Sequence, residues 1–338
     1  MKKALRFGAI AIVVLAAALL TYALSNALYT QQPVGFQLVE APDPGGSALT
    51  VDVWYPTDGR PLPTTLLGFN LISVARDGPV AGSAMPLVVF SHGNGGGPGS
   101  HVDLALALAQ RGFVVAAPMH TGDNYADQRA LVSASWLVDR TRHIHSTLDY
   151  MLSAWPGHDR IDARRIGIFG FSAGGFTALT VIGGQPDLRR VESHCKATPE
   201  FVCKLLADVH SPLLAAASVP AALDFVADVR VKAAVIAAPG LAFTFVPDGL
   251  ANVQVPVQLW TGSADENVPT STNAAAVKAA LGGRAQLREV AGAGHFAFLT
   301  PCGLFGPPFL CHDAAGFDRK RFHTQMNAAV VEFFAKEL

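Results

Sequence analysis

The 338-residue sequence has little charge. Charged residues make up 15% of it and hydrophobic residues 50%, whereas charged residues make up roughly 25% of typical globular proteins. So apolar a composition excludes a disordered chain. The 25 Lys and Arg residues and 26 Asp and Glu residues leave a net charge of -1. The chain therefore lacks the overall positive field of nucleic-acid-binding proteins, and we expect no nucleic-acid partner.

Cysteine is also scarce, with only Cys195, Cys203, Cys302 and Cys311 present. Neither local pair has the C-x-x-C spacing of a zinc site, so we do not expect these cysteines to bind zinc. In an exported protein, an even number of cysteines favours disulfides. Of the three possible connectivities we favour Cys195–Cys203 and Cys302–Cys311, because each closes a short loop. Four free buried thiols are the alternative.

The N-terminal segment resembles a secretory signal. Lys2, Lys3 and Arg6 precede an uncharged apolar run over residues 7–23, as in the n-region and h-region of such signals. Ser25 and Ala27 offer a cleavage site, so we expect residues 1–27 to be a signal peptide and the protein to be periplasmic or secreted. The alternative is an uncleaved N-terminal anchor, although an apolar run of this length is near the short limit for spanning a membrane. Such an anchor would be the only membrane contact that we expect.

Residues 28–338 show no internal repeat and no block of like charge, which indicates one continuous domain. Short apolar runs alternate with longer helical stretches, and several of the runs lack polar alternation, as do parallel strands that are buried on both faces. We therefore predict an α/β fold with a mostly parallel central sheet flanked by helices. The expected strands cover 49–55, 86–90, 113–117, 166–169, 233–237, 255–260 and 286–290, and the expected helices 102–110, 132–153, 173–182, 273–281 and 319–336.

Residues 184–230 interrupt this alternation and form an insertion between a helix and the next strand. The segment contains Cys195 and Cys203 and then an apolar stretch. It could be a lid over a site or additional packing, and the sequence favours neither.

The sequence Gly170-Phe171-Ser172-Ala173-Gly174 follows a buried strand and precedes an apolar helix. That is the context of the G-x-S-x-G nucleophile turn, in which bulkier side chains two positions either side of the serine would collide with backbone. The turn would hold the Ser172 hydroxyl out at the carboxyl edge of the sheet. An ordinary glycine-rich turn is the alternative.

Upstream, the strand over 86–90 leads into Ser91-His92-Gly93-Asn94-Gly95-Gly96-Gly97. A tetrahedral intermediate needs two hydrogen-bond donors for its negative oxygen, and we expect the backbone N–H groups of Asn94 and Ala173 to form this oxyanion hole. His92 is expected to brace the loop. Neither nucleotide-binding glycine motif occurs here, so we expect no nucleotide in this loop.

A serine hydroxyl needs an imidazole base, and the base needs a carboxylate to orient it. His295 follows the last expected strand in a glycine-rich loop, and Asp265 follows the strand over 255–260, with Glu266 as its near rival. The order Ser172, Asp265, His295 is that of α/β-hydrolases. We predict these three as the catalytic residues.

With these motifs the chain resembles the α/β-hydrolase superfamily over nearly all residues after the signal segment. The segment 34–55, the turn Phe90-Ser91-His92-Gly93 and the Ser172 motif resemble bacterial predicted dienelactone hydrolases and platelet-activating-factor acetylhydrolase-like esterases. The resemblance implies hydrolysis of carboxylic esters without metal or organic cofactor. Dienelactone hydrolases proper have a cysteine nucleophile where this chain has Ser172, which argues against dienelactone as the substrate.

We therefore expect a serine esterase that acts on a small-molecule ester, either short-chain or lipid-like. Apolar stretches at 241–246 and 296–298 suggest a hydrophobic pocket, or core packing. An amidase, peptidase or thioesterase would use the same groups, and a non-catalytic binding protein is the remaining alternative.

Overall fold

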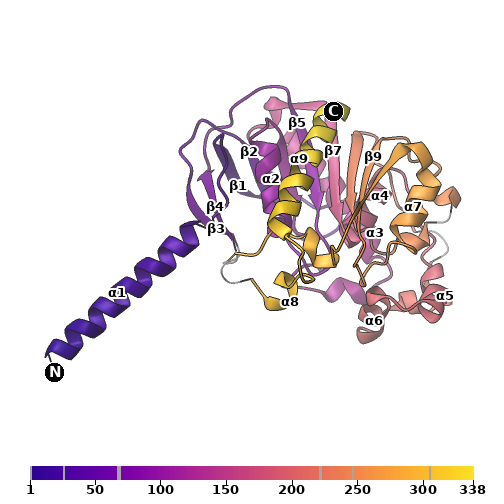
Figure 1. Ribbon diagram of the computed structural model, residues 1–338. Coiled ribbons are helices and arrows are strands. Elements are labelled where there is room, and N and C mark those ends of the chain that lie inside the picture. Colours follow the sequence, from indigo (N-terminus) through magenta and orange to yellow (C-terminus); the bar gives the residue numbers. More distant parts are fainter. Residues whose placement is uncertain (1, 26, 67–69, 221–222, 246, 304–305) are drawn as a thin grey trace.

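A single large sheet runs through the molecule (Figure 1). The computed structural model describes residues 2–25, 27–66, 70–220, 223–245, 247–303 and 306–338. The expected signal segment 1–27 and the insertion 184–230 therefore each lie partly outside the described residues.

Within the described ranges, ten strands form the sheet in the order β10-β9-β8-β7-β5-β6-β2-β1-β4-β3. Their bounds are β1 (Val34–Ala41), β2 (Leu49–Pro56), β3 (Leu62–Leu66), β4 (Asn70–Arg76), β5 (Met85–Ser91), β6 (Val114–Pro118), β7 (Ile161–Phe171), β8 (Val231–Ala237), β9 (Val257–Gly262) and β10 (Ala285–Val290).

The six strands β10, β9, β8, β7, β5 and β6, in this order, pair in parallel, and β2 joins them antiparallel through β6. The predicted strands and the mostly parallel sheet are thus confirmed. The strand expected from Val255 begins at Val257, because Pro256 has no N–H to donate to the ladder. Strands β1, β3 and β4 extend the sheet beyond β2 and were not predicted.

Helices cover both faces of the sheet (Figure 1). Helices α2 (Val102–Ala109) and α9 (Arg319–Glu337) pack on one face, and α3 (Trp136–Ser153), α4 (Ala173–Val181) and α7 (Ala274–Leu281) pack on the other. The predicted helices are therefore present. The long one begins at Trp136 and not at Val132. The Ser133 hydroxyl accepts a hydrogen bond from the Ser135 N–H and also pairs with the Ser135 hydroxyl, and such local side-chain bonds compete with helix formation.

The central strands are buried on both faces. In β5, Leu87 and Val89 lie in the core layer under α3 and α4, whereas Val88 and Phe90 lie in the layer under α2 and α9. Two hydrophobic layers therefore meet across one sheet, which explains the absence of polar alternation in these strands. This rigid centre holds the loops that follow each strand.

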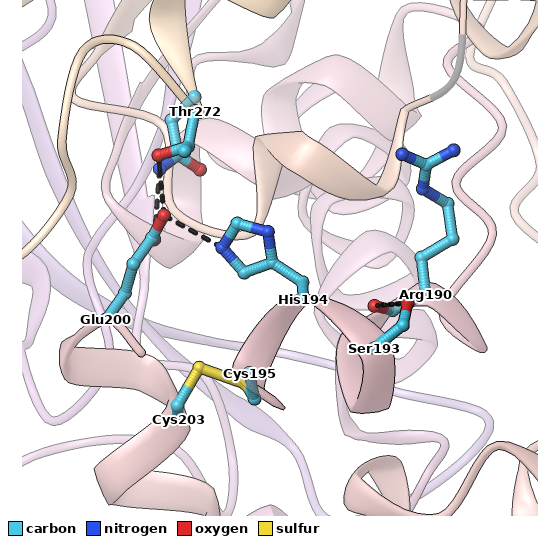
Figure 2. The surroundings of a disulfide bond; sticks show 8 residues. Arg190, Ser193, His194, Cys195, Glu200, Cys203 and Thr272 are labelled. Carbon is cyan, nitrogen blue, oxygen red and sulfur yellow. Dashed lines mark hydrogen bonds and ion pairs between the residues drawn. A yellow bond between two sulfur atoms is a disulfide. The ribbon is translucent and has the colours of Figure 1, made fainter. Parts of the chain in front are cut away.

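The insertion 184–230 forms α5 (Arg190–Ala197), α6 (Phe201–Asp208) and short 3₁₀ turns. Val191, Leu206 and Leu213 are buried in the same core layer as α3 and α4, so the insertion is packed against the main domain. The Cys195–Cys203 disulfide joins its two helices (Figure 2).

The second disulfide, Cys302–Cys311, connects the loop after β10 to the four-residue helix α8 (Pro308–Cys311). Both favoured pairings are thus confirmed.

Helix α1 (Lys2–Ser25) extends away from the body of the molecule (Figure 1). A search of the described residues finds no helix with both the length and the apolar character needed to cross a membrane.

Removal of the Cys195–Cys203 bridge should destabilise the fold. The bridge joins residues separated by eight positions in sequence, and closing so short a loop in the unfolded chain is worth about 2 to 3 kcal/mol. We expect Cys195→Ser/Cys203→Ser to lower the free energy of unfolding by that amount in urea titrations without reductant. The same free energy in variant and wild type would contradict a stabilising bridge.

Candidate active site

Ser172 occupies a strained turn between β7 and α4. It has φ 55° and ψ −119°, a combination that side-chain-bearing residues rarely adopt. This places Ser172 at the N-terminus of α4, where free backbone N–H groups favour negative charge. A serine held in this way matches the geometry of a nucleophile turn.

The two glycines of the motif are required by close backbone approach. A Cβ at Gly170 would lie 2.1 Å from the Gly174 carbonyl oxygen, and a Cβ at Gly174 would lie 1.9 Å from the Ser91 carbonyl oxygen. Both distances are far shorter than van der Waals contact. The sequence argument for glycine at these positions therefore holds, and Gly174 also lets the loop after β5 approach Ser172.

His295 lies within hydrogen-bonding distance of both Ser172 and Asp265. His295 Nε2 is 3.0 Å from Ser172 Oγ, and His295 Nδ1 is 2.8 Å from Asp265 Oδ2. Because an ionised carboxylate only accepts, Nδ1 carries the proton, which leaves Nε2 of the neutral ring to accept from the Ser172 hydroxyl. The three side chains follow β7, β9 and β10, so they meet at the carboxyl edge of the parallel strands.

Asp265 is held in place by backbone. Its Oδ1 accepts hydrogen bonds from the N–H groups of Asn267 (3.0 Å) and Val268 (2.8 Å), and its side chain is fully buried. The rival Glu266 has no such contact with His295 among the described residues.

Asn94 and Ala173 both line the cavity beside Ser172. Their backbone N–H groups donate no hydrogen bond to any described residue, and the Ala173 N–H is the first of α4. Two unpaired donors at one small cavity could bind an anionic oxygen. Within the part of the chain that is described, no group of three or more His, Cys, Asp or Glu side chains could hold a metal ion.

The cavity beside Ser172 has a volume of about 40 Å³, enough for a few water-sized groups. Residues of α6, among them Val202 and Leu205, form one wall. A larger cavity of about 510 Å³ lies along Gly95, Gly96 and Gly97, so the loop after β5 contributes to both cavities.

Glu200 attaches this wall to the main domain (Figure 2). Its Oε1 accepts from Thr272 Oγ1 (2.5 Å) and His194 Nε2 (2.9 Å), and its Oε2 accepts from Asn273 Nδ2 (3.0 Å). Glu200 itself lines the Ser172 cavity. The carboxylate therefore connects the insertion to the start of α7.

His323 on α9 supports the turn that carries His295. Its Nδ1 is 2.7 Å from Asp103 Oδ2 on α2, and its Nε2 is 2.8 Å from the carbonyl oxygen of Ala297. Burial by itself lowers the pKa of His323, but the Asp103 carboxylate outweighs it, so the pKa lies above its usual value. The protonated ring can donate to both partners.

Four further residues contact the segments of the site and are not among those expected from the sequence: Glu200, His323, Asp123 and Arg140. Arg140 alone carries a sequence signal: it lies on the apolar stripe of α3 between Leu137 and Ile144. A charged residue in such a stripe indicates a buried polar contact.

Solved structures resemble this chain over nearly its full length. The ferulic acid esterase from Streptomyces cinnamoneus matches with a TM-score of 0.63 at 22% identity over 91% of each chain. The dienelactone hydrolase from Anabaena variabilis matches with a TM-score of 0.51 at 15% identity, over 90% of this chain and 98% of its own. The chain therefore has the same fold as these two hydrolases, the α/β-hydrolase fold.

Residues 65–136 also match the family model of platelet-activating factor acetylhydrolase, isoform II. This part of the α/β-hydrolase fold includes the loop after β5 and helix α2 but not Ser172. No curated protein sequence matches the chain.

Raising the pH should weaken the hydrogen bonds through which His323 stabilises the fold. A raised pKa in the folded state means that the stabilisation is complete below the unfolded pKa of about 6.5 and is lost as the pH rises through the folded pKa. We expect His323→Gln to lower the free energy of unfolding by about 2 kcal/mol near pH 6 and by less near pH 9. Urea unfolding at both pH values measures the difference.

The exposed His158 offers a matched control. His158→Gln should cost about the same small amount at both pH values. A cost of His323→Gln that does not change with pH would show that the His323 ring is neutral throughout.

Proposed function

We propose that the chain is a serine hydrolase that cleaves carboxylic esters through an acyl-enzyme intermediate, with Ser172, His295 and Asp265 as its catalytic residues. The observation that supports this best is the continuous hydrogen-bonded arrangement from Asp265 through His295 to the strained Ser172. The likeness to esterase structures and to an acetylhydrolase family model agrees with it.

In the first step, His295 Nε2 takes the Ser172 proton while Oγ attacks the ester carbonyl carbon. The carbonyl oxygen becomes negative and accepts from the Asn94 and Ala173 N–H groups. Collapse breaks the bond to the alcohol, which leaves with the proton from His295. Water, deprotonated by the same imidazole, then releases the acid and restores Ser172. Asp265 holds the Nδ1–H tautomer and stabilises the transient imidazolium.

The acyl group is proposed to be short. The cavity of about 40 Å³ beside Ser172 accommodates only a few heavy atoms, and the α6 wall is fixed by a disulfide and by the Glu200 contacts. The cavity along Gly95–Gly97 could receive part of a larger alcohol group.

The protein is proposed to be exported, with residues 1–27 as its signal and residues 28–338 as the hydrolase domain. Its two disulfides support this, because such bonds persist in oxidising compartments. The insertion 184–230 would act as a cover over the Ser172 cavity.

Replacement of the nucleophile tests the mechanism. We expect Ser172→Ala to lower kcat for p-nitrophenyl acetate by about 10⁴-fold or more, since loss of a triad nucleophile removes most of the rate enhancement. The exposed Ser193 provides the control, and Ser193→Ala should retain activity. A fluorophosphonate should label wild type and the control but not Ser172→Ala.

A loss of less than about a hundredfold in Ser172→Ala would contradict the covalent mechanism. Wild type that takes no label and cleaves no ester would favour a binding protein. Faster cleavage of matched anilides or thioesters than of esters would instead identify an amidase or a thioesterase.

The wall of the cavity should set the acyl chain length. Leu205 on α6 lines the cavity, so Leu205→Ala should shift the preference in a series of p-nitrophenyl esters from acetyl and butyryl towards hexanoyl and octanoyl, by about tenfold in relative kcat/KM. Leu214, also in the insertion and partly buried but absent from the cavity wall, gives the control Leu214→Ala. Unchanged selectivity in Leu205→Ala would place the acyl group elsewhere.

A further inference from the structure

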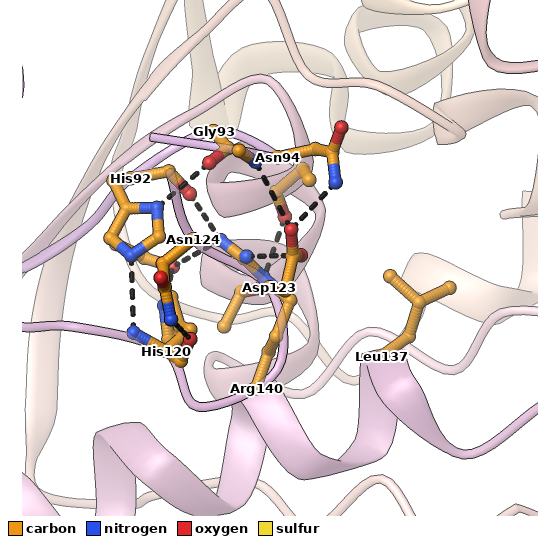
Figure 3. A network of polar contacts seen from close by, with 12 residues as sticks. His92, Gly93, Asn94, His120, Asp123, Asn124, Leu137 and Arg140 are labelled. Atoms are coloured by element: carbon orange, nitrogen blue, oxygen red, sulfur yellow. Dashed lines mark hydrogen bonds and ion pairs between the residues drawn. The ribbon is translucent and has the colours of Figure 1, made fainter. Parts of the chain in front are cut away.

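Beneath the loop that carries Asn94 lies a buried polar network (Figure 3). Arg140 and Asp123 are at its centre, with an Nη1 to Oδ2 distance of 2.6 Å and side chains that are each 1% exposed. A buried ion pair of this kind is costly to form and is retained where its geometry matters. Neither residue contacts the Ser172 cavity, so the pair has no part in the chemistry derived above.

Asp123 binds the loop on its other oxygen. Its Oδ1 accepts from Asn94 Nδ2 at 2.6 Å and from the Gly95 N–H at 3.1 Å. The side chain of Asn94 is thus anchored, while its own backbone N–H remains unpaired among the described residues. One carboxylate therefore fixes the side chain of Asn94 and the peptide unit that follows it.

Arg140 reaches both halves of the proposed oxyanion hole. Its Nη2 donates to the His92 carbonyl oxygen, just ahead of Asn94 in the loop. Its Nε donates to Thr177 Oγ1 (3.1 Å), and that hydroxyl donates to the Ala173 carbonyl oxygen (3.0 Å). A single guanidinium thereby connects the loop after β5 to the first turn of α4.

His92 adds a neutral brace. Its Nδ1 lies 2.7 Å from the Gly93 carbonyl oxygen, so Nδ1 carries the proton, and its Nε2 accepts the His120 N–H at 3.1 Å. Burial, and then the charge of Arg140, hold the pKa of His92 well below its usual value. The ring stays neutral, and Asp123 is left as the direct counter-charge of Arg140.

From these contacts, and resting on the proposed function, we propose that the buried Asp123–Arg140 pair is a positioning device that aligns the Asn94 and Ala173 N–H groups on one oxyanion. Hydrogen-bond strength falls steeply with misalignment, so a small shift of the loop weakens transition-state binding more than substrate binding. The pair should therefore act on kcat, with little effect on KM.

Asn94→Ala tests the anchor without unpairing the buried charges. The variant removes the Nδ2 bond to Asp123 but keeps both the backbone donor and the ion pair. We expect kcat for p-nitrophenyl acetate to fall about tenfold per active site, less than the hundredfold or more that follows loss of an oxyanion donor. Active sites are counted by fluorophosphonate titration, so that a smaller folded fraction does not count as slower catalysis.

Arg140→Lys tests the guanidinium. Lysine keeps the charge, but its single ammonium group cannot reach Asp123, Thr177 and His92 together. We expect a similar fall in kcat per titrated site. The double variant should lose less than the product of the two single losses, because both act on the same loop.

Thr141→Val is the matched control. Thr141 adjoins Arg140 on α3 and pairs with Thr180 at 2.8 Å, away from the loop, so its loss should leave kcat per site unchanged. A trifluoromethyl ketone supplies a second readout, because its adduct places a negative oxygen in the oxyanion hole. Its inhibition constant should rise in Asn94→Ala and Arg140→Lys by the factor by which kcat/KM falls.

Failure of the proposed function and failure of the positioning role would give different results. Wild type that takes no fluorophosphonate and cleaves no ester would refute the proposed function itself. If wild type is active and Ser172→Ala is inactive, but kcat per site in both Asn94→Ala and Arg140→Lys stays within twofold of wild type, the positioning role is overturned. An unchanged inhibition constant for the trifluoromethyl ketone in both variants would overturn it as well.

Discussion

The backbone of Ser172 is the constraint on which the site depends. Its left-handed φ can persist only because β7 holds the turn from one side and α4 from the other. The same turn brings Gly174 against the Ser91 carbonyl, closer than any side chain would allow. A single local geometry thus presents the hydroxyl, begins α4 at Ala173 and admits the neighbouring loop.

The central strands of the parallel part of the sheet are predictable from sequence because they are buried on both faces and therefore read as nearly unbroken apolar runs. Ser172 follows such a strand in a glycine-rich turn. Asp265 and His295 are predictable because each follows an expected strand in a loop of small residues, although most positions of β10, the strand before His295, are exposed. Strands β1, β3 and β4 are harder to predict from the sequence. Their exposed positions include Leu38 and Leu62, and their place in the sheet is set by pairing between distant segments.

The buried polar residues are the part of the site that is hardest to predict from the sequence. Arg140 can be noticed in the apolar stripe of α3, but its partner Asp123 lies in an irregular loop where an aspartate is ordinarily exposed. His323 and Glu200 are similar cases, because their hydrogen-bond partners lie far away in the sequence: the carbonyl of Ala297 for His323, and the side-chain amide of Asn273 for Glu200. A one-dimensional pattern contains no information on such pairings.

The Cys195–Cys203 bridge has a consequence for biosynthesis. It links α5 to α6, the helix that forms one wall of the Ser172 cavity. Part of the shape of that wall is therefore fixed by oxidation of two thiols and not by folding alone. In a reducing environment, the newly made chain would hold Ser172, His295 and Asp265 in the same arrangement, but α6 would be less firmly fixed beside them. For the proposed esterase, oxidation of the two cysteines would then restrict which substrates enter the cavity and leave the arrangement of Ser172, His295 and Asp265 unchanged.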